Sequence, residues 1–225
     1  MTGIAWPLML TDTYKHKGLR KKLVDELRKM GVSNQQVLEA MGRVPRHYFL
    51  SSAFLEFAYE NKAFQIGAGQ TISHPYTVAV QTELLNVNAG MKILEIGTGS
   101  GFQTAVLCEM GVKVYSVERQ KLLHDNSKKL LQTMGYKPHL VYGDGYKGLP
   151  AFAPFDRVIV TCAVPRVPED LLMQIRPGGL LVMPYGDGEV QQMMVITEAE
   201  DGTFSSQLHG GFSFVPMLEK RNSLH

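Results

Sequence analysis

The chain has 225 residues, 44% of them hydrophobic and 20% charged, with a formal net charge of +2, which excludes a disordered chain and gives no support to a polyanion-binding surface over the whole protein. Two cysteines, Cys108 and Cys162, are too few for a disulfide framework and indicate a reducing compartment. No apolar run approaches membrane-spanning length and the N-terminus lacks a signal-peptide pattern, so we expect a cytoplasmic protein without membrane or nucleic-acid contacts.

Residues 1–65 are predicted to form a helical extension. Apolar residues recur at helical spacing from Leu19 to Met30, and a second helix follows in which Ser33 and Gln36 have capping-box spacing. The basic residues between positions 15 and 22 are expected on a solvated helix face. The histidines of this region, His16 and His47, are isolated in the sequence. Nothing here has the spacing of metal ligands, so we expect no metal site.

The segment at 66–79, IGAGQTISHPYTVA, is polar and glycine-rich and leads into a helical pattern. Its composition predicts a loop at the mouth of whatever the core forms. A plainer interpretation is a capped helix start, with Ser73 or Thr71 as N-cap and Pro75 in the first turn. Spacing alone favours the cap.

The stretch at 92–102, KILEIGTGSGF, predicts a buried strand, a glycine turn and a helix that begins near Phe102. Glycines such as Gly97 and Gly99 can take positive φ, and without a Cβ they let the backbone approach a nucleotide-like ligand. The helix start adds free N–H groups that favour an anion. Taken alone, the pattern indicates a tight turn equally well.

The next predicted strand ends in an acidic residue, Glu118, about twenty residues past the glycines. In a strand–turn–helix–strand unit, a carboxylate at this place accepts hydrogen bonds from ribose hydroxyls. The alternative is a surface carboxylate paired with Arg119. The position of Glu118 therefore strengthens the case for a nucleotide-like ligand.

Helices and strands continue to alternate along the rest of the chain. The sequence predicts helices at 104–109, 122–134 and 167–175, strands at 139–142, 155–160 and 180–184, a turn at 177–179, and an antiparallel hairpin formed by 191–197 and 204–214. This order predicts an α/β fold, a doubly wound, mostly parallel sheet with an antiparallel C-terminal hairpin. Residues 66–225 would form that core as one unit, with ligands at the carboxyl ends of the strands.

Two classes of nucleotide site are disfavoured by the glycine spacing. A dinucleotide fold has G-x-G-x-x-G, but Gly101 follows Gly99 by two residues, and Phe102 holds the place of the third glycine. The sequence also lacks the G-x-x-x-x-G-K-[ST] pattern of phosphoryl transfer. These departures count against NAD and against a P-loop.

Several segments resemble known motifs. LEIGTGSG, Glu118, GDG at 143–145, APFDRVIV at 153–160 and RPGG at 176–179 are similar to the successive motifs of class I S-adenosylmethionine-dependent methyltransferases. GQTISHPYTVA, VPRHYF, GDGYKGLPAFAPFD and FVPM resemble the protein-L-isoaspartate O-methyltransferase family. The likeness runs from Val44 to Met217. It implies a Rossmann-like fold and methyl transfer from S-adenosylmethionine to the α-carboxylate of L-isoaspartyl residues in damaged proteins, with S-adenosylhomocysteine as product.

The resemblance also implies a set of site residues. Ser73 would be the catalytic hydroxyl, Gly97 and Gly99 would border the methionine part of the cofactor, and Glu118 would hold the ribose. The full set implied to contact the cofactor is Thr71, Ile72, Ser73, His74, Gly97, Thr98, Gly99, Glu118, Asp144 and Gly145, the last two at the adenine. The set implied to contact the substrate is Ser73, His74 and Val215.

The implied chemistry needs no general base, because a carboxylate with a pKa of about 4 is already ionised at neutral pH. His74, the obvious acid–base candidate, is therefore expected to have a structural or positioning role. Two alternatives stay open: a methyltransferase of the same fold with another acceptor, and a cofactor-binding protein without activity. The first dozen residues and those from Leu218 to His225 show no pattern that aligns with the family. We expect a monomer.

Overall fold

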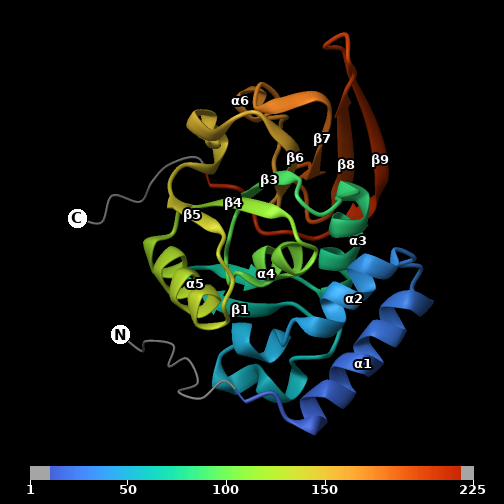
Figure 1. Cartoon of the computed structure of the whole chain (residues 1–225), viewed down its shortest axis with the longest axis vertical. Helices are drawn as coiled ribbons and strands as arrows, with labels where there is room; N and C mark the ends of the chain where they lie inside the picture. The colour runs from blue at the N-terminus through green and yellow to red at the C-terminus, as the bar shows by residue number, and fades with distance from the viewer. Residues whose placement is uncertain (1–10, 219–225) are drawn as a thin grey trace.

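The computed structural model describes residues 11–218, and its centre is a seven-stranded sheet (Figure 1). The spatial order of the strands is β5-β4-β3-β6-β7-β8-β9. The first five are parallel, and β8 and β9 add to them in antiparallel fashion. Their bounds are Lys92–Ile96 (β3), Lys113–Glu118 (β4), His139–Tyr142 (β5), Phe155–Val160 (β6), Ile175–Tyr185 (β7), Gln191–Glu198 (β8) and Phe204–Phe212 (β9). This arrangement confirms the predicted fold class.

Helices cover both faces of the sheet because successive strand residues point to opposite sides. Ile93 of β3 and Ile159 of β6 pack under α3 (Pro75–Leu85) and α4 (Phe102–Glu109). Their neighbours in sequence, such as Leu94 and Val158, pack on the other face with α6 (Glu169–Leu172). The helix α5 (Lys121–Thr133) and two short 3₁₀ turns, Gly145–Lys147 and Pro150–Phe152, complete the layers. The fold is therefore doubly wound around one sheet.

The N-terminal region adds a further layer on α3 and α4 (Figure 1). Buried residues of α1 and α2 share one hydrophobic cluster with residues of α3, α4 and α5. The elements of this region are α1 (Tyr14–Lys29), α2 (Gln35–Arg43), 3₁₀ helices at Arg46–Phe49 and Ser52–Phe57, and a two-stranded sheet of β1 (Phe64–Gly67) and β2 (Gln70–Ile72). The division of the chain at residue 65 stays a prediction. No helix within residues 11–218 is both long and apolar enough to cross a membrane.

The predicted capping box at the start of α2 is wrong. The N-cap is Asn34, whose side-chain oxygen accepts hydrogen bonds from the N–H groups of Gln36 and Val37. Ser33 instead donates both its N–H and its hydroxyl to one carboxylate oxygen of Glu83, at 2.8 and 2.9 Å. Ser33, which local spacing favoured as the N-cap, is therefore held by the Glu83 carboxylate of α3 instead.

The region around the RPGG segment also differs from the prediction. Only Glu169–Leu172 is helical, and the chain is already in β7 at Ile175, which pairs with Phe155 of β6. The pairing resumes with Leu180 opposite Arg157, so the residues at 176–179 form an irregularity inside the strand rather than a turn before it. Glycine is needed here because a Cβ on Gly179 would lie 2.4 Å from a side-chain carbon of Ile175.

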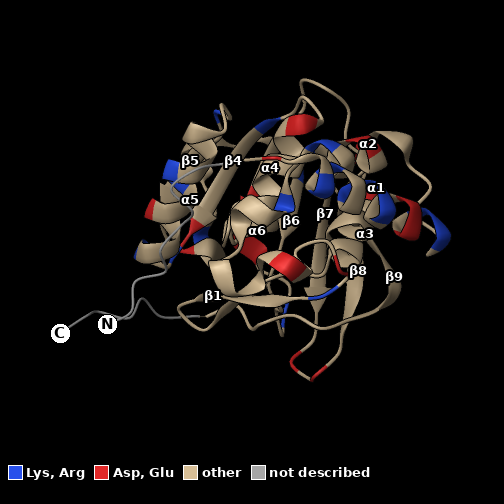
Figure 2. Cartoon of the chain, turned by 90° about the horizontal axis from the view of Figure 1, so that it is seen from below, with Lys and Arg blue, Asp and Glu red and all other residues tan. Residues whose placement is uncertain are grey.

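The two N-terminal histidines, which are far apart in the sequence, lie together in the structure. The rings of His16 and His47 lie with centroids 3.9 Å apart, and both belong to what we call the Arg20 network, formed by Asp12, His16, Arg20, His47 and Tyr59. Basic residues recur along α1 (Figure 2). Arg20 is buried, whereas the neighbouring lysines of that helix are exposed. The predicted solvated face therefore holds for the lysines and is wrong for Arg20.

Possible metal-ligand atoms of Asp12, His16 and His47 lie within 4.8 Å of one another. Both Asp12 oxygens already accept hydrogen bonds from the Arg20 guanidinium, at 3.1 and 2.8 Å. His47 uses Nδ1 on the Tyr59 hydroxyl, at 2.6 Å, and Nε2 on a backbone carbonyl. A fixed guanidinium charge at the carboxylate opposes a second cation. We therefore interpret the cluster as a structural hydrogen-bond network.

Candidate active site

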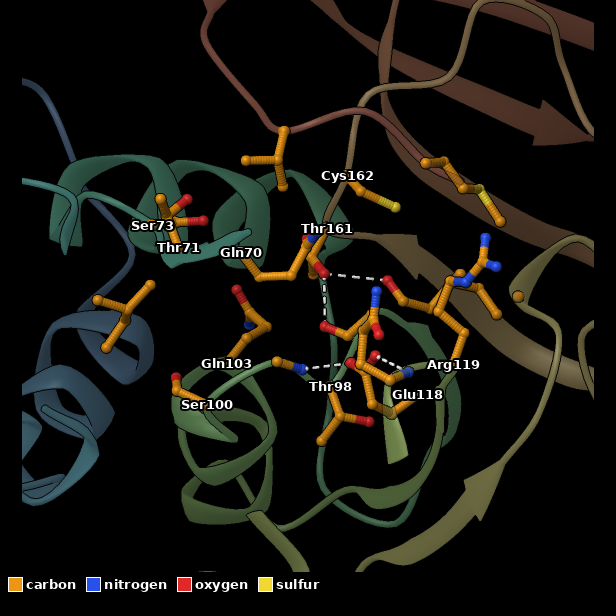
Figure 3. Close-up of a pocket in the computed structure, with 18 of the residues that line it drawn as sticks. Gln70, Thr71, Ser73, Thr98, Ser100, Gln103, Glu118, Arg119, Thr161 and Cys162 are labelled. Atoms are coloured by element: carbon orange, nitrogen blue, oxygen red, sulfur yellow. Dashed lines mark hydrogen bonds between the residues drawn. The ribbon is translucent and has the colours of Figure 1, made fainter. Parts of the chain in front are cut away.

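A pocket opens at the carboxyl ends of β3, β4 and β6, where a doubly wound sheet is expected to bind its ligand (Figure 3). Its walls come from the β1–β2 hairpin, α3, the glycine turn, the start of α4 and the last described residues. The lining residues are Gln70, Thr71, Ile72, Ser73, Val78, Gln81, Ile96, Gly97, Thr98, Gly99, Ser100, Phe102, Gln103, Val117, Glu118, Arg119, Gln120, Gly145, Thr161, Cys162, Val215, Pro216, Met217 and Leu218.

The glycine turn is fixed from two neighbouring strands. Gly97 has φ +95°, and its N–H donates to the carbonyl of Val117 in β4 at 2.9 Å. The hydroxyl of Thr161, which follows β6, lies 2.7 Å from the carbonyl oxygen of Gly97. A Cβ on Gly97 would lie only 2.6 Å from this hydroxyl. Glycine is therefore required here by backbone conformation and by space.

Glu118 lies at the end of β4 and is only 4% exposed. Its carboxylate accepts the N–H of Gly99 on one oxygen and the N–H of Gln120 on the other, both at 2.8 Å. Burial raises the pKa of this carboxyl, and the backbone N–H groups act in the opposite direction. The alternative of a surface carboxylate is wrong. Because each carboxylate oxygen has two lone pairs, the group can still accept hydrogen bonds from a ligand.

A second buried carboxyl, that of Glu95, lies in β3 just before the glycine turn. It is fully buried, and one oxygen accepts a hydrogen bond from the hydroxyl of Thr104 in α4 at 2.5 Å. Burial raises its pKa to about 7. The contact ties the strand before the turn to the helix after it.

The GQTIS segment forms β2 and the link to α3, and its residues Gln70, Thr71, Ile72 and Ser73 all line the pocket. Figure 3 labels Gln70, Thr71 and Ser73 on this wall. The predicted N-cap at Ser73 or Thr71 is wrong. The N-cap of α3 is His74, which makes no side-chain capping bond, and Pro75 occupies the first turn as expected.

The capping oxygen at α3 comes from outside the helix. Asn61 accepts a hydrogen bond from the N–H of Tyr76 at 2.9 Å through its side-chain oxygen. The chain around Asn61 is held by Arg46, a fully buried residue that donates to the carbonyls of Ala58 and Lys62 at 3.0 and 2.8 Å. The Ser73 hydroxyl is thus not needed for capping and lies on the pocket wall.

Of three further residues implied by the resemblance, one lines the pocket and two do not. Gly145 lines the pocket, and a Cβ there would lie 2.6 Å from Ile96. Asp144 is not among the lining residues, and one of its oxygens accepts the N–H of Tyr146. His74 is likewise outside the lining set, and burial together with the charge of Arg46 lowers its pKa. The cofactor roles of Asp144 and His74 stay predictions.

Part of the pocket wall was not predicted from the sequence. Besides Val215, which was expected, Pro216, Met217 and Leu218 line the pocket. The segment pairs with Ala163, which donates its N–H to Val215 at 2.8 Å and accepts that of Met217 at 2.7 Å. Arg119 donates to the carbonyl of Leu218. We call residues 215–218 the strap; the family likeness ended at Met217 and gave no role to Leu218.

Further lining residues were also missed, among them Gln81, Gln103, Thr161 and Cys162. Thr161 and Cys162 directly follow β6, so the rule that ligands lie at strand ends could have indicated them. Gln81 and Gln103 lie inside helices, where no local pattern marks a polar residue as lining a site. Burial raises the pKa of the Cys162 thiol to about 12, which favours the protonated thiol over the nucleophilic thiolate.

These residues fit S-adenosylmethionine. The positive-φ glycines make a cradle that a Cβ would fill, the buried carboxylate of Glu118 suits two ribose hydroxyls, and Ile96, Val117 and Met217 offer apolar surface to an aromatic base.

Comparisons with known proteins agree with this geometry. The sequence profile of the family described as protein-L-isoaspartate(D-aspartate) O-methyltransferase matches residues 18–222. The chain is 50% identical to a protein-L-isoaspartate O-methyltransferase of Christiangramia forsetii, over 95% of this chain and all of the relative. It is 52% identical to the corresponding protein of Cytophaga hutchinsonii, over 94% of this chain and 96% of the relative.

Two solved structures share the fold. One, a protein-L-isoaspartate O-methyltransferase, superposes with a TM-score of 0.80 at 29% identity, over 88% of this chain and 65% of that longer chain. The other, a Plasmodium falciparum protein in complex with S-adenosyl-L-homocysteine, gives a TM-score of 0.78 at 22% identity, over 89% of this chain and 99% of that one.

Proposed function

The chain belongs to the protein-L-isoaspartate(D-aspartate) O-methyltransferase family, and we propose that its reaction takes place in the pocket between the GQTIS segment and the glycine turn. It is a methyltransferase that uses S-adenosylmethionine to esterify L-isoaspartyl residues, a reaction of protein repair. The observation that carries the site assignment is the placement of Ser73 and Glu118 on walls of one pocket, with Gly97 and Gly99 also lining it.

The cofactor supplies an electrophilic methyl group on a sulfonium. The acceptor carboxylate needs no activation, because its pKa of about 4 leaves it ionised at neutral pH. Such an acceptor has no proton to remove, so His74, whose pKa is lowered by burial, is not required as a base. Catalysis then rests on alignment, for which effective molarities on the order of 10⁵ M are attainable.

Different residues of the pocket would position the cofactor and the substrate for this alignment. Glu118 and the glycine turn would hold the cofactor from the sheet side. Ser73 would donate a hydrogen bond to the substrate carboxylate from the opposite wall. The N-terminus of α3, adjoining Ser73, adds a positive dipole end that favours the anion. An isoaspartyl linkage displaces the α-carboxylate by one methylene, so a site that fixes both backbone and carboxylate would align only that isomer.

The test is transfer of a radiolabelled methyl group to matched isoaspartyl and aspartyl peptides. The wild type should methylate the isoaspartyl peptide alone. Ser73→Ala should lower kcat/KM by roughly ten- to a hundredfold, as expected for loss of one charge-assisted hydrogen bond of about 1.5–3 kcal/mol. Ser205→Ala, at an exposed position of β9, is the matched control. Equal labelling of both peptides would refute the substrate assignment, and full activity of Ser73→Ala would remove Ser73 from the site.

We further propose that the protein acts as a monomer in the cytoplasm and binds no nucleic acid. Cys108 and Cys162 are both free thiols, which fits a reducing compartment. Sedimentation analysis at micromolar concentration tests the oligomeric state, since a dimer would nearly double the sedimenting mass.

A further inference from the structure

Gln103 lines the pocket from the first turn of α4, and it has no role in the site as described so far. The residue is 7% exposed. In Figure 3 its amide lies between Ser100 and the side chains of the GQTIS segment, on the way from the glycine turn to Ser73. Its place between the two walls makes it a candidate for contact with a bound ligand.

The orientation of this amide is set by a chain of two hydrogen bonds. The hydroxyl of Thr82 in α3 donates its only hydrogen to the carbonyl of Val78, at 2.7 Å. That hydroxyl can therefore only accept from Gln103, whose Nε2 lies 2.9 Å away. A flipped amide would place two acceptors against each other. The carbonyl oxygen Oε1 of Gln103 must then point away from Thr82.

This oxygen is buried and has no hydrogen-bond partner within residues 11–218. A buried acceptor without a donor costs free energy, and native structures leave few such atoms. Gln81 shows the contrast, because its amide nitrogen donates to the carbonyl of Val160 at 2.9 Å. A slight tilt of the Gln103 amide about its bond to Thr82 would turn Oε1 into the pocket that the side chain already lines. The missing donor is thus expected from a ligand.

We propose that Gln103 Oε1 accepts a hydrogen bond from the α-ammonium group of the methionine part of the cofactor, an inference that rests on the proposed function. An ammonium carries three N–H donors and a positive charge. It therefore suits an uncharged carbonyl oxygen that accepts no hydrogen bond from the described residues. Gln103 lies four residues after Gly99, beside the turn that borders the methionine part. A peptide N–H of the substrate is the other possible donor, but Gln103 lies beside the glycine turn, on the wall proposed to hold the cofactor, which favours the cofactor over the substrate.

Calorimetric binding of three ligands tests the inference without any turnover. S-adenosylhomocysteine carries the ammonium and the carboxylate, decarboxylated S-adenosylmethionine carries the ammonium alone, and 5′-methylthioadenosine carries neither. Gln103→Leu should weaken binding of the first two by about tenfold, as expected for one hydrogen bond to a charged group. Binding of 5′-methylthioadenosine should change by less than about twofold. Gln207→Leu, at an exposed position of β9, is the control and should leave all three affinities unchanged.

Thermal unfolding of each variant shows whether it is folded, and Gln103→Met replaces the leucine variant if that one fails to fold. Equal losses for all three ligands would overturn the inference, because the effect would not depend on the ammonium. Unchanged S-adenosylhomocysteine affinity with a raised KM for the isoaspartyl peptide would also overturn it and assign the acceptor to the substrate. A wild type that binds none of the three ligands would refute the proposed function itself, a result distinct from either of these.

Discussion

The Arg20 network and the pocket wall are both buried and polar, but they differ in where their hydrogen bonds go. In the network, Arg20 donates to both oxygens of Asp12, to the Tyr59 hydroxyl and to the carbonyl of Gly42. His47 uses both of its ring nitrogens within the protein. In the pocket, the Gln103 oxygen has no partner among the described residues, and the Glu118 carboxylate has acceptor capacity left after two backbone bonds.

The difference separates two uses of a buried polar group. Groups that satisfy one another hold elements of the fold together, since removal of one leaves the rest buried and unpaired. Groups with unused capacity on a pocket wall are stabilised only when a ligand arrives. Substitutions in the network should therefore change stability, and those on the pocket wall should change binding.

Arg20→Ala is expected to have the largest effect and to act on stability alone. Removing the guanidinium leaves the Asp12 carboxylate and the Tyr59 hydroxyl without their donor, which should lower the free energy of unfolding by about 3 kcal/mol. Urea denaturation measures this loss, with Lys21→Ala, at an exposed position of the same helix, as control. A loss of cofactor affinity in the folded variant would contradict the separation between network and pocket.

Glu118→Gln should lower cofactor affinity, which the network substitution leaves unchanged. The substitution removes the charge and one acceptor from the proposed ribose site, so the dissociation constant of S-adenosylhomocysteine should rise by roughly ten- to a hundredfold, corresponding to about 1.5–3 kcal/mol. Some stability should be lost as well, about 1–3 kcal/mol, because the new amide nitrogen faces one of the two backbone N–H groups that the carboxylate accepts. Calorimetry and thermal unfolding measure the two quantities, with Glu39→Gln on the exposed side of α2 as control. Unchanged affinity would remove Glu118 from the site.

The smallest effect is expected for His47, and only at acid pH. Burial, followed by the neighbouring His16, lowers the pKa of His47 to about 4. The unfolded chain takes up a proton at this residue near its ordinary pKa of 6.5, whereas the folded chain does so only near 4. The contribution of neutral His47 is therefore complete above pH 6.5 and is lost as the pH falls toward 4.

Urea denaturation at pH 7.5 and pH 5 compares the wild type with His47→Gln. The wild type should lose more stability between the two pH values than the variant, while its cofactor affinity at pH 7.5 stays equal to that of the variant. Equal losses would mean that His47 does not titrate differently in the two states.

The sequence alone indicated the sheet, the glycine turn and Glu118, because each depends on a local pattern of strand, glycine and helix. It gave the wrong cap for α3, since the capping oxygen comes from Asn61, and no pattern in the GQTIS segment records that contact. Ser33 was misassigned for the same reason, through its contact with Glu83. Gln103 could not be found, because its role depends on which way Thr82 of another helix directs one hydrogen.

The strap makes the end of the described chain part of the wall of the proposed ligand site. Ligand binding and the pairing of the strap should therefore be coupled. Suppose that the ligand binds only while Val215 and Met217 are paired with Ala163. The free energy by which this pairing favours binding then equals the free energy by which bound ligand stabilises the pairing. Saturation with cofactor should then slow amide hydrogen exchange at Met217. Conversely, a fusion partner that pulls on the chain beyond Leu218 should lower cofactor affinity, so the N-terminal end is the better place for a tag.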